Sequence, residues 1–184
     1  MIGPFRDKFP NVAPSAFVHL LAEIRGDVSI GENSAVFHFC SLRGDINRIE
    51  IGSSVNVQEH STLHVSDGNP CVLREWVTVG HHAVIHGALI EKGALVGIGA
   101  VIMDGAVIGE EALVAAGAVV TPGMKVPPRT LVAGTPARPV RELRAEEIQE
   151  NYRRAARYIE QLAPWYKKAQ EEAQGENLRL PETR

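Results

Sequence analysis

Aromatic side chains are scarce in this chain. Phe, Trp and Tyr together make up only 5% of the 184 residues, although hydrophobic residues reach 45%. A core of Val, Ile, Leu and Ala without bulky rings favours a slender solenoid over a thick sandwich of two sheets. The length allows one domain with a full core and one appended element.

Other absences narrow the possible partners and compartments. No stretch of 18 apolar residues is present, so we expect no membrane span. Residues 1–10 lack a charged segment followed by an apolar run, so we expect no signal peptide and a cytoplasmic location. The net charge of −3 and the lack of a Lys/Arg run argue against a nucleic-acid partner. Cys40 and Cys71 are not spaced as a metal-binding pair, and we expect reduced thiols of no evident role.

Aliphatic residues recur every six positions through most of the chain, with three interruptions. A period of six matches neither one face of an α-helix nor the simple alternation of a strand. It is typical of a triangular coil in which three six-residue units close one turn, with successive turns about 4.8 Å apart. The pattern predicts a left-handed parallel β-helix of hexapeptide repeats over residues 1–140. The repeated positions are Val12, Val18, Ile24, Ile30, Val36, Leu42, Ile51, Val57, Leu63, Leu73, Val79, Ile85, Ile90, Val96, Ile102, Ile108, Val114, Val120, Val126 and Val132.

After residue 140 the composition shifts toward Glu, Arg, Ala, Gln and Lys, and the period changes. Apolar residues spaced three to four apart predict an amphipathic α-helical segment over 141–174. Pro164 is expected to kink or split this helix. Residues 175–184 form a polar tail that we expect to be frayed. The apolar positions of the predicted helix are Ile148, Tyr152, Ala155, Ile159 and Leu162.

The register of the repeat arranges the histidines in columns. Leu63 and Ile85 are three units apart, so the residues that follow them, His64 and His86, stack one coil apart. The same count places Arg43 below His64 in this outward-facing column. The four histidines outside the predicted site, which we expect to be solvated or structural, are His19, His38, His60 and His82.

His81 belongs to a different column, on another side of the triangle. One coil below it lies Glu59, with Gln58 beside it. Neighbouring columns are separated by close to 20 Å, whereas zinc–nitrogen bonds are about 2.0–2.1 Å. His81 can therefore meet His64 and His86 only across two chains, and closed three-fold symmetry would create three equivalent sites. We predict a homotrimer with a three-histidine metal site that leaves one position open for water.

Four segments resemble a known family: SLRGDI, NVQEHSTLHV, VGHHAVIHGALI and AGTPARPVREL. They are similar to the gamma-class carbonic anhydrase-like hexapeptide-repeat family, and the likeness covers nearly the whole chain. This resemblance implies reversible hydration of carbon dioxide to bicarbonate by a metal-bound hydroxide at a trimer interface. It also implies that His64 and His86 of one subunit and His81 of the next bind Zn²⁺, with Fe²⁺ or Co²⁺ also suited to imidazole ligands.

The resemblance further assigns roles to residues around the ligands. Arg43 and Asp45 would form an ion pair between subunits. Gln58 would hydrogen-bond the metal-bound hydroxide, and Glu59 would lie beside it. Tyr158 would reach from the C-terminal helix toward the metal pocket with its hydroxyl group. The alternative for Tyr158 is that its ring only anchors the helix.

Two positions depart from the family's pattern. Ile46 follows Asp45 where the family has an acid, and Glu59 replaces an expected aspartate. The loop over 66–70 contains a single acid, Asp67. Proton export after hydration thus has no evident acidic shuttle, which leaves it to buffer or to Glu59. Two other functions stay open: a hexapeptide acyltransferase or thioesterase, and a non-catalytic trimeric scaffold or accessory protein with a retained metal site.

Overall fold

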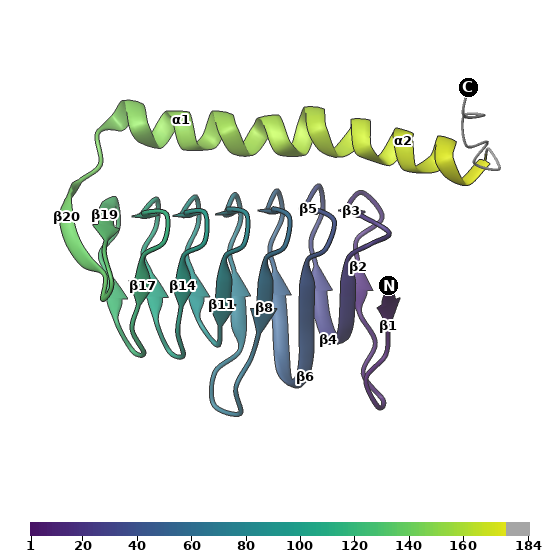
Figure 1. The fold of residues 1–184 in the computed structure, drawn as a ribbon, viewed down its shortest axis with the longest axis horizontal. Helices are drawn as coiled ribbons and strands as arrows, with labels where there is room; N and C mark the ends of the chain where they lie inside the picture. The colour runs from purple at the N-terminus through teal and green to yellow at the C-terminus, as the bar shows by residue number, and fades with distance from the viewer. Residues whose placement is uncertain (176–184) are drawn as a thin grey trace, which may run out of the picture.

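The chain folds as a left-handed parallel β-helix that is followed by one long helix (Figure 1). The computed structural model describes residues 1–175. Each coil of the β-helix is triangular, its sides are short strands, and successive coils stack in parallel. This arrangement confirms the fold predicted from the six-residue period. The expected polar tail over 175–184 lies, beyond Gly175, outside the described residues.

Two sides of the triangular prism belong to one sheet, which has twelve strands within residues 1–175. The long strand β6 turns a corner of the prism, so it pairs with β8 on one side and with β9 on the other. The strands of this sheet are β1 (Ile2–Gly3), β2 (Asn11–Val12), β4 (Glu23–Ile30), β6 (Ser41–Ile51), β8 (Thr62–His64), β9 (Cys71–Leu73), β11 (Val84–His86), β12 (Leu89–Ile90), β14 (Val101–Ile102), β15 (Val107–Ile108), β17 (Val119–Val120) and β18 (Lys125–Val126).

The third side of the prism is a second sheet, with eight strands in the described part of the chain. Its last pair, β19 and β20, is antiparallel, which ends the parallel stacking and turns the chain toward the helix. β20 runs across the boundary that the sequence predicts at residue 140. The strands are β3 (Phe17–Val18), β5 (Ala35–Val36), β7 (Asn56–Val57), β10 (Thr78–Val79), β13 (Leu95–Val96), β16 (Leu113–Val114), β19 (Thr130–Ala133) and β20 (Arg138–Glu142).

The aliphatic side chains of the repeat point into the prism and form one continuous core. In the regular coils, paired residues are eighteen positions apart, as in Val96 with Val114 and Ile102 with Val120. Because successive side chains of a strand alternate between its two faces, one inward residue in each strand leaves its neighbours pointing outward. From Ile24 onward the inward residues are buried, and Ile102 is 0% exposed. The outward positions are therefore free to hold the polar groups of a site.

The C-terminal helix lies lengthwise along the prism and runs back toward the first coils (Figure 1). Its parts are α1 (Ala145–Ala156), the π-helical segment η1 (Arg157–Leu162) and α2 (Ala163–Gly175). The sequence predicts that Pro164 kinks or splits the helix, and a split is wrong, because the helix continues through this residue. Pro164 has no N–H to donate. The turn before it widens instead, and the Ala163 N–H donates to the Tyr158 carbonyl five residues back, as in a π-helix.

An aromatic cluster between the helix and the first coils stabilises this continuous helix. The ring of Phe37 lies 5.7 Å from the rings of both Tyr158 and Tyr166, in edge-on contacts. Phe17 and Ala163 are buried in the same cluster. These contacts lie on both sides of Pro164 in the sequence, so tertiary packing offsets the local cost of the proline.

Both cysteines are free and buried in the core of the prism. Burial raises the pKa of Cys40 and of Cys71 to about 12, so both stay protonated at neutral pH. Metal binding requires the thiolate, and neither cysteine is therefore suited to it. Among residues 1–175, no helix is both long enough and apolar enough to cross a membrane.

We expect the substitution Ile102→Ala to reduce the free energy of unfolding by about 2–5 kcal/mol, because it leaves a cavity in a core with few aromatic rings. Ile2, which is 51% exposed, offers a matched control, and Ile2→Ala should change the free energy by no more than about 0.5 kcal/mol. Urea titration followed by circular dichroism measures both. Equal losses in the two variants would contradict the core position of Ile102.

Candidate metal site

His64 and His86 lie at the ends of strands β8 and β11 and point away from the core. The residues before them, Leu63 and Ile85, are 0% exposed and point inward, so the histidines face outward. The strand register pairs His64 with His86 and Arg43 with His64. The column predicted from the repeat is therefore confirmed.

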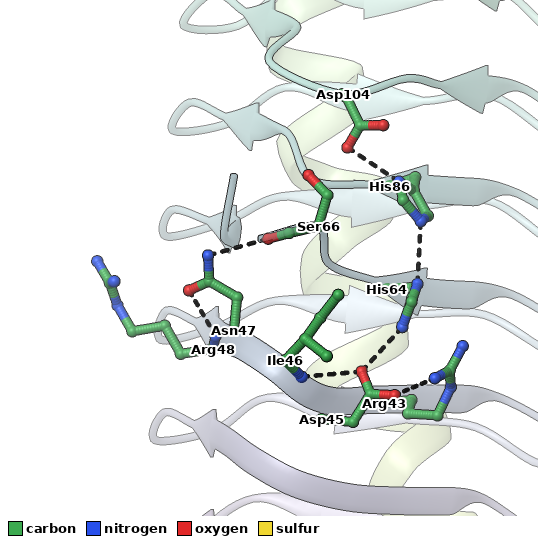
Figure 2. A network of polar contacts seen from close by, with 9 residues as sticks. All are labelled: Arg43, Asp45, Ile46, Asn47, Arg48, His64, Ser66, His86 and Asp104. Carbon is green, nitrogen blue, oxygen red and sulfur yellow. Dashed lines mark hydrogen bonds and ion pairs between the residues drawn. The ribbon is translucent and has the colours of Figure 1, made fainter. Parts of the chain in front are cut away.

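A continuous line of polar contacts joins two carboxylates through the two imidazole rings (Figure 2). Asp45 Oδ1 lies 3.0 Å from His64 Nε2, and His64 Nδ1 lies 2.9 Å from His86 Nε2. His86 Nδ1 in turn lies 3.0 Å from Asp104 Oδ1. One nitrogen of each ring thus contacts a carboxylate, and the other nitrogen faces the second ring.

Both carboxylates are held in the ionised form. Burial by itself would raise the pKa of Asp45, but the hydrogen bond from His64 and the charge of Arg43 outweigh it and lower the pKa. The pKa of Asp104 is lowered first by a hydrogen bond from the Ser66 hydroxyl and then by the one from His86. At neutral pH both side chains can therefore only accept hydrogen bonds.

The ionised carboxylates determine which nitrogen of each ring has the proton. His64 must donate from Nε2 to Asp45, and His86 must donate from Nδ1 to Asp104. A neutral imidazole has only one N–H, so the nitrogens that face each other, 2.9 Å apart, both present lone pairs. A cation between them, either a shared proton or a metal ion, removes this repulsion. Two ligands of a tetrahedral zinc ion are about 3.3 Å apart, so the pair fits two positions of such a site.

Asp104 is a site residue that the sequence reasoning does not single out. It reaches His86 across Gly87, where an added Cβ would lie only 2.4 Å from Asp104 Oδ1. The glycine is therefore necessary for this contact. The six-residue period contains the signal, because Ile85 pairs with Ile102 and the same register brings the residues two places further on, Gly87 and Asp104, side by side.

Asp45 also bonds to the neighbouring arginine. Within one chain, the Arg43 guanidinium donates to Asp45 Oδ2, and the Ile46 N–H donates to Asp45 Oδ1. The Asp45 side chain is only 11% exposed, so these donors hold it in one orientation behind His64. A role of the Arg43–Asp45 pair between subunits stays a prediction.

His81 lies in the second sheet, just after β10, and has its own carboxylate. Glu59 Oε2 is 2.6 Å from His81 Nδ1, and Glu59 Oε1 is 3.9 Å from His38 Nδ1. Glu59 Oε2 is buried and makes no aligned hydrogen bond among residues 1–175. His81 is thus its nearest charge partner. A carboxylate beside Nδ1 leaves Nε2 of His81 as the nitrogen that can bind a metal, which is the arrangement common for metal-binding histidines.

One chain by itself does not bring the three predicted ligands together. Within residues 1–175, no group of three or more His, Cys, Asp or Glu side chains could hold a metal ion. The structure pairs His64 with His86 and leaves His81 in the other sheet. This separation agrees with the expectation that the third ligand comes from another subunit.

His81 does come together with two other predicted residues, in a groove between the second sheet and the helix. Gln58, His81 and Tyr158 all line this groove, which has a volume of about 420 Å³. Gln58 is buried, and its Nε2 donates to Asn56 Oδ1 at 3.1 Å. Burial, followed by the negative charge of Glu59, raises the pKa of Tyr158, so its hydroxyl stays protonated.

The other histidines make contacts typical of structural residues. His60 and His82 stack face to face, with ring centroids 4.7 Å apart and an angle of 1° between the rings. Both occupy a corner of the coil where the backbone is left-handed, with φ angles of 63° and 58°. His38 and His19 lie against each other and against Tyr166 of the helix.

Comparison with known proteins identifies relatives of this chain by sequence and by structure. The family model described as "Bacterial transferase hexapeptide (six repeats)" matches residues 87–122. A carbonic anhydrase of Geobacillus kaustophilus is 43% identical over 172 residues, which are 94% of this chain and 94% of that protein. The mitochondrial gamma carbonic anhydrase 1 of Arabidopsis thaliana is 42% identical over 91 residues, or 46% of this chain and 33% of that protein. A crystal structure of a hexapeptide transferase family protein from Anaplasma phagocytophilum superposes with a TM-score of 0.85 at 36% identity, covering 89% and 96% of the two chains.

The coiled prism and its six-residue period define a hexapeptide-repeat protein with paired outward histidines. The likeness to the carbonic anhydrases extends over almost the entire chain. The chain therefore belongs to the gamma-class carbonic anhydrase-like family of hexapeptide-repeat proteins.

We expect Asp104→Asn to lower the affinity for Zn²⁺ by about 10- to 100-fold, because residues that orient a metal-binding histidine typically contribute this much. Asp67→Asn is the matched control, since Asp67 is an exposed acid in the neighbouring loop. Competition with a chromophoric chelator measures both affinities. Unchanged affinity in Asp104→Asn would show that the carboxylate does not determine the tautomer of His86.

Proposed function

We propose that this protein catalyses the reversible hydration of carbon dioxide to bicarbonate at a metal site shared between two subunits of a homotrimer. The main support is the pair of lone pairs that His64 and His86 direct at each other across 2.9 Å. Asp45 and Asp104 fix the tautomers of the two rings. The two facing lone pairs can then bind a cation. The 43% identity to a carbonic anhydrase over 94% of the chain supports the choice of reaction.

The third ligand in this proposal is His81 of the neighbouring subunit. Its Nδ1 is matched to Glu59, as the rings of His64 and His86 are matched to Asp45 and Asp104. Every proposed ligand thus has a carboxylate partner that orients its ring. Three imidazoles are the ligand set of several catalytic zinc sites, in which the fourth position stays open to water.

A zinc ion held by these three histidines would act as a Lewis acid and would lower the pKa of bound water to about 7, the value typical of the zinc sites of carbonic anhydrases. Imidazole also suits Fe²⁺ and Co²⁺. The protein's own part is to fix the ligand rings and to present a groove with hydrogen-bonding groups beside them.

Gln58 and Tyr158 are the groups that we assign to substrate orientation. The bond from Gln58 Nε2 to Asn56, and the bond from Asn56 Nδ2 to Thr78 Oγ1 at 2.8 Å, hold the Gln58 amide in place. Tyr158 offers a hydroxyl that remains a donor, because its pKa is raised. An amide and a phenol can both bind the oxygens of bicarbonate without adding charge. We assign Glu59 to orienting His81.

Subunit sharing can be tested by complementation between two inactive variants. His64→Ala and His81→Ala should each lose most of the bound metal and the hydration activity. If the two are denatured and refolded together in equal amounts, random assembly into trimers leaves about one quarter of the sites with all three histidines. Bound metal per chain, measured by mass spectrometry, and hydration rate should recover together toward that fraction.

His60→Ala is the matched control for these variants, because His60 stacks on His82 outside the proposed ligand set. It should keep full metal occupancy. Full metal in His81→Ala, or no recovery in the mixed trimers, would contradict a site shared between subunits. Full metal without hydration activity in the unmodified protein would favour a scaffold that has retained the site.

Proton export gives a second test at Ile46. This side chain is 55% exposed, and its own N–H bonds to Asp45 behind His64. The hydration cycle releases a proton, and Ile46 cannot accept it. At low buffer concentration, Ile46→Glu should raise the hydration rate by roughly tenfold, which is below the 10²–10⁴-fold of an optimally placed acid–base group.

Ile46→Gln is the control, because the glutamine side chain has nearly the same shape as glutamate but no ionisable group. Stopped-flow measurements with a pH indicator should show that the gain disappears at high buffer concentration, where buffer takes the proton directly. An equal gain with glutamine would rule out proton transfer as its cause.

A further inference from the structure

Two units of the repeat are enlarged at the same corner of the prism, the one that directly follows the proposed ligand pair. Aliphatic positions are nine residues apart between Leu42 and Ile51 and ten apart between Leu63 and Leu73. The second of these units contains the loop over 66–70, which we call the corner loop. Strand β6 pairs with β8 before this corner and with β9 after it, so the extra residues of the two units lie one coil apart and can contact each other.

Asn47, in the first enlarged unit, ties the corner loop to the coil below it. Its Nδ2 donates to the Ser66 carbonyl at 3.1 Å (Figure 2) and to the Asp67 carbonyl at 3.2 Å. Its Oδ1 accepts from the Arg48 N–H at 2.8 Å, which fixes the orientation of the amide. Both polar atoms of the Asn47 side chain thus have partners within the same chain, and two consecutive carbonyls of the corner loop are held by one amide.

Inside the corner loop, Ser66 and Asn69 bond to each other. The Ser66 N–H donates to the Asn69 carbonyl at 3.1 Å, and the Asn69 N–H donates back to the Ser66 carbonyl at 3.2 Å. Asn69 Nδ2 also donates to Ser66 Oγ at 3.3 Å. The position of the Ser66 hydroxyl is therefore set by Asn69 from within the loop and by Asn47 from outside it.

The corner loop lies against Gly87, beside the contact between His86 and Asp104. A Cβ at Gly87 would lie 3.0 Å from Asn69 Cβ and 2.4 Å from Asp104 Oδ1, so the loop and the carboxylate converge on this glycine. Asp104 accepts a hydrogen bond from the Ser66 hydroxyl, and it also accepts from His86 Nδ1 at 3.0 Å. The corner loop thus reaches the carboxylate that orients the ring.

We propose that Asn47 is a positioning residue of the metal site, which acts on His86 by holding the corner loop against Asp104. The loop restricts the carboxylate to one orientation and limits the access of water to the His86 Nδ1–H. An amide suits this role, because it has two N–H donors for the two carbonyls and an acceptor for the Arg48 N–H. All of these contacts lie within one chain, so they do not depend on which surfaces the trimer covers. The importance of this ring for metal binding rests on the proposed function, whereas the clamp on the loop does not.

NMR of the metal-free, ¹⁵N-labelled full-length protein tests the clamp directly. In Asn47→Ala the His86 Nδ1–H should exchange with water about tenfold faster, as the loss of one to two hydrogen bonds predicts for a local opening equilibrium. The His64 Nε2–H is the internal reference, because it donates to Asp45 and its exchange should not change. Asp67→Ala is the matched control, since it removes an exposed side chain of the corner loop and keeps the carbonyl that Asn47 binds.

A double-variant cycle tests whether Asn47 acts through Asp104. Asn47→Ala should lower the affinity for Zn²⁺ by about three- to tenfold, less than the roughly 10- to 100-fold expected for Asp104→Asn, because it lies one contact further from the ring. The variant with both substitutions should bind Zn²⁺ no more weakly than Asp104→Asn alone, since residues of one network are not additive. Additive losses would overturn the proposal, because they would show that Asn47 affects the site by another route.

Ser66→Ala provides a second variant that leaves Asn47 and the loop backbone intact, and it should also speed the exchange at His86. Unchanged exchange at His86 in both Asn47→Ala and Ser66→Ala would overturn the proposal, as would equal changes at His64 and His86. The exchange measurement needs neither metal nor substrate. Faster exchange in a protein without hydration activity would support the clamp and contradict the proposed function, and hydration activity with unchanged exchange would do the reverse.

Discussion

The parallel stacking of equivalent positions from coil to coil is the constraint on which the rest of this structure depends. Because Leu63 pairs with Leu42 and with Ile85, the residues that follow them are forced into a column only one strand spacing apart. His64 and His86 therefore meet whether or not a metal is bound. The backbone hydrogen bonds of the sheet and the aliphatic core hold them there, so the fold itself preorganises the two rings.

Stacking alone does not make a metal site, since two neutral histidines can also hydrogen-bond to each other. The carboxylates exclude that option. Asp45 and Asp104 stay ionised and each takes the N–H of one ring, which leaves two lone pairs face to face. Repulsion between these lone pairs is a local cost that a cation would remove. The contact from Asp104 further depends on Gly87, whose missing side chain opens the path to His86.

The C-terminal helix determines the surroundings of the site. It returns along the prism (Figure 1). Tyr158 and Arg154 of this helix line the same groove as His81. The π-helical turn at Arg157–Leu162 contains Tyr158, and π-turns are often found at functional positions. Here the wider turn also lets the helix pass Pro164 without a break. One local irregularity thus serves both the course of the helix and the lining of the groove.

The β-helix, the inward aliphatic positions and the column of Arg43, His64 and His86 could all be predicted from the sequence. These features follow from the six-residue period, which can be read directly from the spacing of aliphatic residues along the chain. The unbroken helix through Pro164 depends on packing against Phe17 and Phe37. These residues are more than 120 positions away in the chain, so local propensity favoured a break that tertiary packing overrides. The contact between Asp104 and His86 and the groove between helix and sheet also depend on side-chain reach and on how the helix docks, and neither quantity is encoded in spacing along the chain.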